Sequence, residues 1–169
     1  PDLPLHDMTG GSTWMPMVLA QLDPSLDTEA LQAGVERARY MLRNAAHLRV
    51  QQQRSQLLVT VTNLTGHKLP TGYPEGRRMW LNVQFRDGSG ALLKESGTYD
   101  FDTAELFADS EAKIYEAVPV VGENIAGVVG LPAGAKFHFV LNNDVAKDNR
   151  IPPLGFTNAD YEAFGGAPV

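Results

Sequence analysis

The strongest candidate for binding chemistry is the loop of residues 65–80, TGHKLPTGYPEGRRMW, which we call the His67 loop. Its three glycines reach backbone conformations closed to other residues, and its two prolines fix φ and remove backbone donors, so we expect a rigid loop. A neutral imidazole on a rigid loop can bind a metal ion through one ring nitrogen while a hydrogen bond orients the other. The alternative is that His67 only hydrogen-bonds carbonyls of its own loop.

The same loop carries three candidates for contact with a bound cofactor. Arg77 and Arg78 could hold a carboxylate or propionate through the bidentate guanidinium fork, and Tyr73 lies between them and His67 in the sequence. The alternative for the two arginines is a structural ion pair with a carboxylate, namely Asp87, Glu95 or Asp100.

A second candidate metal ligand is His6, in the segment LHDMTGG. Asp7 could orient its ring, and the two glycines let the chain approach a flat surface. On these residues alone, His6 would be a surface histidine. We interpret His47, at a helix-to-strand junction, and His138, between two phenylalanines, as structural.

Common enzyme signatures do not occur in the sequence. It lacks the Gly-x-Ser-x-Gly elbow, the phosphate-binding Gly-x-x-x-x-Gly-Lys loop and the His-Glu-x-x-His pair. Two polar segments could bind calcium, but neither has EF-hand spacing, which favours solvated loops. They contain Asp100, Asp102, Glu105 and Asp109, and Asn142, Asn143, Asp144, Asp148 and Asn149.

The composition of the chain excludes further classes of protein. A chain of 169 residues with 43% hydrophobic residues can bury a core, which predicts one domain or one domain with an appendage. The formal charge of −6 argues against a nucleic-acid partner, and no apolar run approaches the roughly 20 residues that span a bilayer. With no cysteine, the chain has no disulfide, no thiolate ligand and no attachment site for a covalent haem.

The elements that must position these residues begin with a helix. Residues 1–24 show no sustained period and predict an extended arm, with one short apolar turn at residues 15–22. Residues 25–47 predict one long α-helix, in which Asp27 is the N-cap and apolar residues recur in steps of three and four. This is the only helix that the pattern supports clearly.

From residue 48 to residue 169 the pattern predicts a β-rich domain. Period-two alternation indicates strands over residues 47–52, 57–62 and 78–86, and DGSG predicts a hairpin turn before a returning strand at 91–97. Further strands are expected at 113–118 and 135–141. Short strands separated by Gly and Pro turns suggest an antiparallel, immunoglobulin-like β-sandwich or an open barrel. The last segment loses its periodicity, so we expect the chain to be a piece of a longer protein, truncated at its C-terminal end.

Three segments in this order resemble a known family. VTVTNLTGHKLPTGYPEGRRMWLNVQFRDGSGALLKESG and FHFVLNNDVAKDNRIPPLGF resemble the haem-free, β-rich C-terminal region of exported multihaem c-type cytochromes of the cytochrome c-554-like kind. HDMTGGSTWMP is similar to the segment that follows a Cys-x-x-Cys-His-Met-Pro haem site in those proteins. The resemblance covers nearly the whole chain, although each piece is short.

The resemblance implies a function and a set of site residues. The chain would support electron transfer by packing against haems, with the arm of residues 1–24 on the haem region. His6 and His67 would be distal axial ligands of haem iron, and Arg77 or Arg78 would hold haem propionates. The haem c itself would be attached by residues outside this chain, in the same protein or another one. The protein would be periplasmic or extracellular and would exchange electrons with a redox partner protein. The alternatives are an immunoglobulin-like module that docks a redox or cell-surface partner, with Trp14, Tyr73 or Trp80 exposed, or part of a multihaem reductase.

Overall fold

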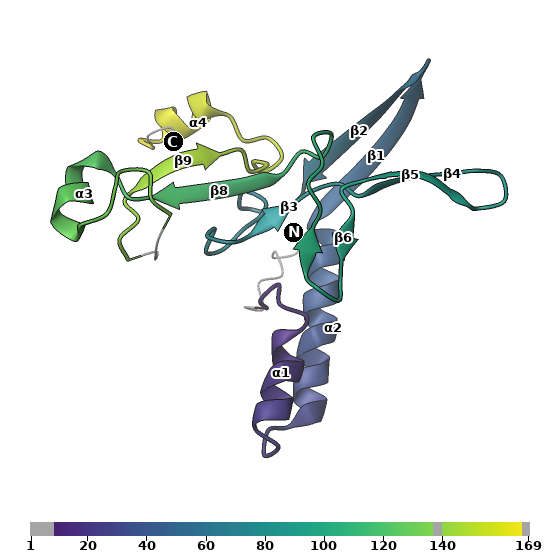
Figure 1. Cartoon of the computed structure of the whole chain (residues 1–169), viewed down its shortest axis with the longest axis horizontal. Coiled ribbons are helices and arrows are strands. Elements are labelled where there is room, and N and C mark those ends of the chain that lie inside the picture. The colour runs from purple at the N-terminus through teal and green to yellow at the C-terminus, as the bar shows by residue number, and fades with distance from the viewer. Residues whose placement is uncertain (1–8, 137–139, 167–169) are drawn as a thin grey trace. The chain divides into compact units, whose positions relative to one another are not determined.

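The computed structural model describes residues 9–136 and 140–166 (Figure 1). The chain is mainly β, with small antiparallel sheets and a few mostly short helices. It divides into two compact units, Pro1–Gly66 with Thr157–Val169, and His67–Phe156. The division after Gly66 falls inside the range 48–169 that we predicted as one sandwich domain. Each unit is therefore described by itself.

Two neighbouring helices begin the first unit, α1 (Met15–Leu22) and α2 (Thr28–Asn44) (Figure 1). The short apolar turn predicted at residues 15–22 of the arm corresponds to α1, which is a helix of eight residues. The Ser12 hydroxyl accepts a hydrogen bond from the Met15 amide at 3.2 Å, and Pro16 lies in the first turn, where its missing N–H costs no helical bond. The apolar α1 gains its stability by packing on α2.

Helix α2 is shorter than the range 25–47 predicted for it. Asp27 is its N-cap, as predicted, and its carboxylate accepts from the Glu29 and Ala30 amides, both at 3.0 Å. Val35 and Ala38 on the predicted apolar stripe are each 2% exposed. The helix ends at Asn44 because the backbone from Ala46 onward pairs with a strand instead.

The next element is a β-hairpin of β1 (Ala46–Gln53) and β2 (Gln56–Asn63), which confirms the predicted strands. The turn between them places Arg54 at φ 56°. Leu48 lies opposite Val61 and Val50 opposite Val59, so one face of the hairpin is apolar. Helix α4 (Asn158–Ala163) also belongs to this unit, and Thr157 caps it by accepting from the Asp160 amide.

The largest sheet of the second unit has β8 (Tyr115–Val120) between β3 (Arg78–Met79) and β9 (Asp144–Asp148), all antiparallel (Figure 1). The strand predicted at 113–118 corresponds to β8. Residues 137–139 of the strand predicted at 135–141 lie outside the described residues. Strand β9 lies where we predicted no periodicity, because its first four residues are all exposed and no buried face imposes apolar alternation.

A second hairpin joins β4 (Val83–Arg86) to β5 (Leu92–Ser96), as the DGSG turn predicted. The Asp87 carboxylate holds this turn by accepting from the amides of Ser89 and Ala91. A further pair comprises β6 (Tyr99–Asp100) and β7 (Glu105–Leu106), and helix α3 (Glu123–Val129) follows β8.

The strand predicted over residues 78–86 is interrupted, and the prediction of one continuous strand is wrong. Trp80 and Asn82 both donate a side-chain hydrogen bond to the Gly97 carbonyl, at 3.0 and 3.1 Å. Residues 80–82 therefore form a connection between β3, which pairs with β8, and β4, which pairs with β5. Among the described residues the strands form four separate small sheets, and the sandwich stays a prediction. In the same part of the chain, no helix is long and apolar enough to cross a membrane.

Candidate functional site

The first half of the His67 loop is held by a cluster of three charged side chains, Lys68, Asp148 and Arg150, which we call the Asp148 clamp. The Arg150 guanidinium donates to both carboxylate oxygens of Asp148, at 2.9 and 2.8 Å, and the Lys68 Nζ donates to Oδ2 at 2.9 Å. The Asp148 side chain is only 10% exposed. The Arg150 hydrogen bonds, aided by Lys68, outweigh the burial and hold the pKa of Asp148 well below its usual range.

Backbone hydrogen bonds continue the same attachment. The Leu69 amide donates to the Ile151 carbonyl and the Ile151 amide donates to the Leu69 carbonyl, both at 2.8 Å. Leu69 is 4% exposed and Pro70 is also buried, with a cis peptide bond between them. Residues 68–70 are thus fixed to a segment 80 positions later in the chain, through side chains and backbone together.

The second half of the loop is closed by Arg77. Its guanidinium donates to the carbonyl of Thr71, and its amide donates to the Pro74 carbonyl at 3.1 Å. The guanidinium lies where a side chain on Gly72 would begin, and Gly72 itself has φ +77°. Glycine is therefore required here twice, for backbone conformation and for space. The expected ion pairs of Arg77 and Arg78 with Asp87, Glu95 or Asp100 do not form in the described part of the chain.

Tyr73 is exposed and belongs to the arc of residues 71–77 that Arg77 closes. Its hydroxyl donates to Glu75 Oε2 at 2.7 Å, and 48% of the residue is exposed. Desolvation, this hydrogen bond and the negative charge of Glu75 raise the pKa of Tyr73 to about 12. The phenol is therefore neutral and acts as a hydrogen-bond donor throughout the physiological pH range.

His67 and Arg78 are both exposed. His67 directly precedes Lys68 of the Asp148 clamp, so its backbone is attached to a fixed segment. Arg78 lies in β3 opposite Glu116 of β8, but the Glu116 carboxylate pairs with Lys147 at 2.8 Å. The candidate residues Tyr73, Arg77 and Arg78 thus belong to one loop and its first strand, and each has different surroundings.

Of the other three histidines, one lies among the described residues. His6 and His138 lie outside the described residues. His47 is exposed on β1, opposite Thr62. The described residues contain no group of three or more His, Cys, Asp or Glu side chains that could hold a metal ion by themselves.

Several residues of the polar segments considered for calcium accept hydrogen bonds, whereas both polar side-chain atoms of Asn142 are buried with no partner among the described residues. Asp100 accepts from two amides of its own turn, and Asp109 accepts from the Ser96 hydroxyl at 2.6 Å and the Gly97 amide at 2.8 Å. These bonds, the Ser96 bond foremost, lower the pKa of Asp109 to about 2. Asn149 accepts from the Glu116 amide at 2.9 Å, and Asp148 is the centre of the clamp.

Sequence reasoning missed the Asp148 clamp as a unit. Lys68 was not singled out, Arg150 was noted only within a longer segment, and Asp148 was considered as a calcium ligand. The only sequence signal was that TGHKLPTG and DNRIPPLGF both resembled segments of one family. Of the aromatic residues considered for docking, Trp14 is 62% exposed. The Trp80 indole N–H donates to the Gly97 carbonyl, and the centroid of the Trp80 ring lies 5.5 Å from that of Tyr99.

Comparison of the chain with protein-family models, with curated proteins and with solved structures finds no match.

Proposed function

We propose that this chain is the haem-free, β-rich part of an exported multihaem c-type cytochrome and that it supports electron transfer by supplying a distal axial histidine. One observation carries the proposal: the exposed His67 directly precedes the Asp148 clamp. The clamp joins TGHKLPTG to DNRIPPLGF, two of the three segments on which the resemblance rests. A ligand to haem iron needs this combination of an accessible imidazole and a fixed backbone.

The residues of the His67 loop suit a haem that is held elsewhere. The chain has no cysteine, so residues outside it must attach the haem and provide the proximal ligand. This chain then needs to supply only one imidazole to the haem iron. It does not need a cluster of several metal ligands. When bound, haem iron supplies one-electron transfer. His6, in the proposed role of a second distal ligand, would serve another haem.

Charged and polar side chains of the His67 loop are of the type that binds the propionates of a haem. Arg78 is exposed and outside any described ion pair, so its guanidinium can hold a carboxylate in a bidentate manner. Arg77 uses its guanidinium to close the arc at Thr71, and its remaining N–H groups are available to the same ligand. Tyr73 supplies a neutral phenol.

The clamp would act on the rate of electron transfer through rigidity. A histidine whose backbone moves little changes its distance to iron little when the iron changes its charge, and this keeps the reorganisation energy low. In this proposal the finer fold is an immunoglobulin-like sandwich, the location is periplasmic or extracellular, and the partners are the haem-bearing segment and a redox protein. Of the aromatic residues named for the docking-module alternative, Trp14 and Tyr73 are exposed, whereas Trp80 is occupied inside its own unit.

The test is the optical and electron paramagnetic resonance spectrum of the complete cytochrome with His67→Ala. We expect one haem to change from low spin to high spin, because it loses a strong-field axial ligand. His47→Ala is the matched control, since His47 is also an exposed histidine and should leave the spectrum unchanged. An unaltered low-spin population in His67→Ala would reject the ligand role.

A further inference from the structure

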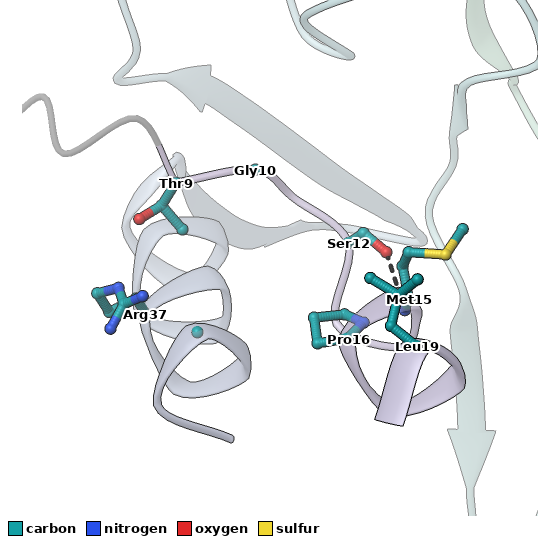
Figure 2. A pocket seen from close by; sticks show the side chains of 8 residues that line it. Thr9, Gly10, Ser12, Met15, Pro16, Leu19 and Arg37 are labelled. Atoms are coloured by element: carbon teal, nitrogen blue, oxygen red, sulfur yellow. Dashed lines mark hydrogen bonds between the residues drawn. The ribbon is translucent and has the colours of Figure 1, made fainter. Parts of the chain in front are cut away.

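A groove of about 340 Å³ lies between α1 and α2 in the first unit (Figure 2). Its volume is at the lower end of the range of pockets that bind small molecules. The residues that matter for its chemistry come from the segment before α1, from α1 and from α2: Ser12, Met15, Pro16, Leu19, Gly34 and Arg37. Arg37, on the α2 wall of the groove, has no role in the function proposed for His67.

The electrostatics of the groove are set by Arg37. Its neighbours one turn away on α2, residues 33, 34, 40 and 41, are all uncharged, and α1 contains no charged residue. Arg37 forms no salt bridge in the described part of the chain. By contrast, Arg39 on the same helix pairs with Glu36 at 2.6 Å. The Arg37 charge therefore has no counter-ion on either helix that forms the groove.

Three apolar side chains of α1 line the groove, together with the polar Thr9 and Ser12 of the preceding segment. Met15 and Leu19 are 39% and 42% exposed, and Pro16 lies between them on α1. Gly34 leaves the α2 wall without a side chain, and the Arg37 Nη2 lies 3.7 Å from the position that a Cβ on Gly34 would occupy. The guanidinium thus lies beside the gap in the α2 wall and can pair with a group that enters the groove.

We propose that this groove binds a small amphipathic carboxylate, with its acid group on Arg37 and its apolar part against Met15, Pro16 and Leu19. A planar guanidinium matches a carboxylate in two parallel hydrogen bonds, and its single positive charge balances the single negative charge of the acid. The Ser12 hydroxyl uses its oxygen as the acceptor for Met15 and keeps its own proton for donation. The groove shares the segment HDMTGGSTWMP with the haem proposal, but its acid-binding group, Arg37, has no part in that proposal.

The experiment is a titration of the 169-residue chain with octanoate, followed by the methyl NMR signals of methionine and leucine. We expect saturable shifts at Met15 and Leu19, and binding about tenfold tighter than that of octanol, which has the same tail without the charge. Octylammonium, with the opposite charge, should bind more weakly than octanol.

Variants identify the group that recognises the acid. Arg37→Gln should abolish the preference for octanoate over octanol, while Arg43→Gln, an exposed arginine in the last turn of the same helix, should keep it. Circular dichroism checks that both variants are folded. The proposal is overturned if octanoate gives no saturable shift, if octanol binds as tightly, or if Arg37→Gln retains the preference.

Discussion

Asp148 shows how one residue can organise two distant segments. It accepts from Lys68, which precedes it by 80 positions, and from Arg150, two positions after it. A carboxylate that is mostly buried would be costly without cationic donors, and here two of them share it. The clamp is therefore sensitive to loss of the central charge more than to loss of either cation alone.

Replacement of Asp148 by Asn should lower the free energy of unfolding by about 2 kcal/mol, because Lys68 and Arg150 then lose their shared counter-ion in a partly buried position. Urea unfolding followed by tryptophan fluorescence measures this change. Asp102→Asn is the control, since Asp102 is exposed, and it should stay within about 0.5 kcal/mol of the parent. Equal effects of the two substitutions would contradict a special role for Asp148.

Tyr73 should titrate separately from an ordinary tyrosine, because desolvation and the hydrogen bond to Glu75 favour its neutral form. A spectrophotometric titration of tyrosinate absorbance should contain a component with a pKa of about 12. Tyr73→Phe should remove this component, and Glu75→Gln should move it to lower pH. If the component that Tyr73→Phe removes titrates near pH 10 instead, the hydrogen bond is absent in solution.

At the scale of elements, the composition of the His67 loop has a structural explanation in two parts. Residues 68–70 are attached to residues 148–151 by the Asp148 clamp and by two backbone hydrogen bonds. Residues 71–77 close on themselves through Arg77, and both Gly72 and Gly76 have positive φ. Glycine and proline residues thus lie in two consecutive short segments, 68–70 and 71–77, and the backbone of each segment is constrained.

Substitution of Gly72 by Ala should destabilise the protein by about 1 to 2 kcal/mol, because a side chain at φ +77° is strained and its Cβ would displace the Arg77 guanidinium. Thermal unfolding measures the effect. Gly66→Ala in the same loop is the matched control, since Gly66 does not have positive φ and has nothing within 4 Å of an added Cβ. Similar melting temperatures for both variants would argue against the observed path of residues 71–77.

At the scale of the whole molecule, acid should weaken folding through Asp109 and Asp148. Both carboxyls have a lowered pKa in the folded chain, so their stabilisation is complete above the unfolded value of 3.8 and is lost as pH falls through the folded values. The free energy of unfolding should therefore decrease from about pH 4 downward, with the Asp109 contribution lost near pH 2.

The comparison of Asp109→Asn with the parent chain isolates one of these carboxyls. Urea unfolding at intervals from pH 5 to pH 2 should show a shallower decrease in the variant, because one proton fewer is taken up on unfolding. The two curves should run parallel at pH values where Asp109 is ionised in both states, and the difference in the free energy of unfolding should be largest there and shrink as the pH falls. Parallel curves over the whole range would contradict the lowered pKa of Asp109.

Elements that depend on near neighbours in the chain could be predicted from the sequence. Asp27 identified the start of α2, alternation identified β1 and β2, and the DGSG turn identified the β4–β5 hairpin. These features can be predicted from the sequence because a cap, a two-residue period and a tight turn each involve residues a few positions apart. The same local signals gave α1 only as a short apolar turn, because its stability comes from packing on α2.

Contacts between residues far apart in the chain became known only from the tertiary structure. The pairing of Lys68 with Asp148, the bridge from Leu69 to Ile151 and the place of β9 beside β8 join segments tens of residues apart. No periodicity encodes such pairs, because burial and hydrogen bonding between segments depend on how the chain folds back on itself. His67 was recognisable as a candidate from its loop, but the clamp beside it required the fold.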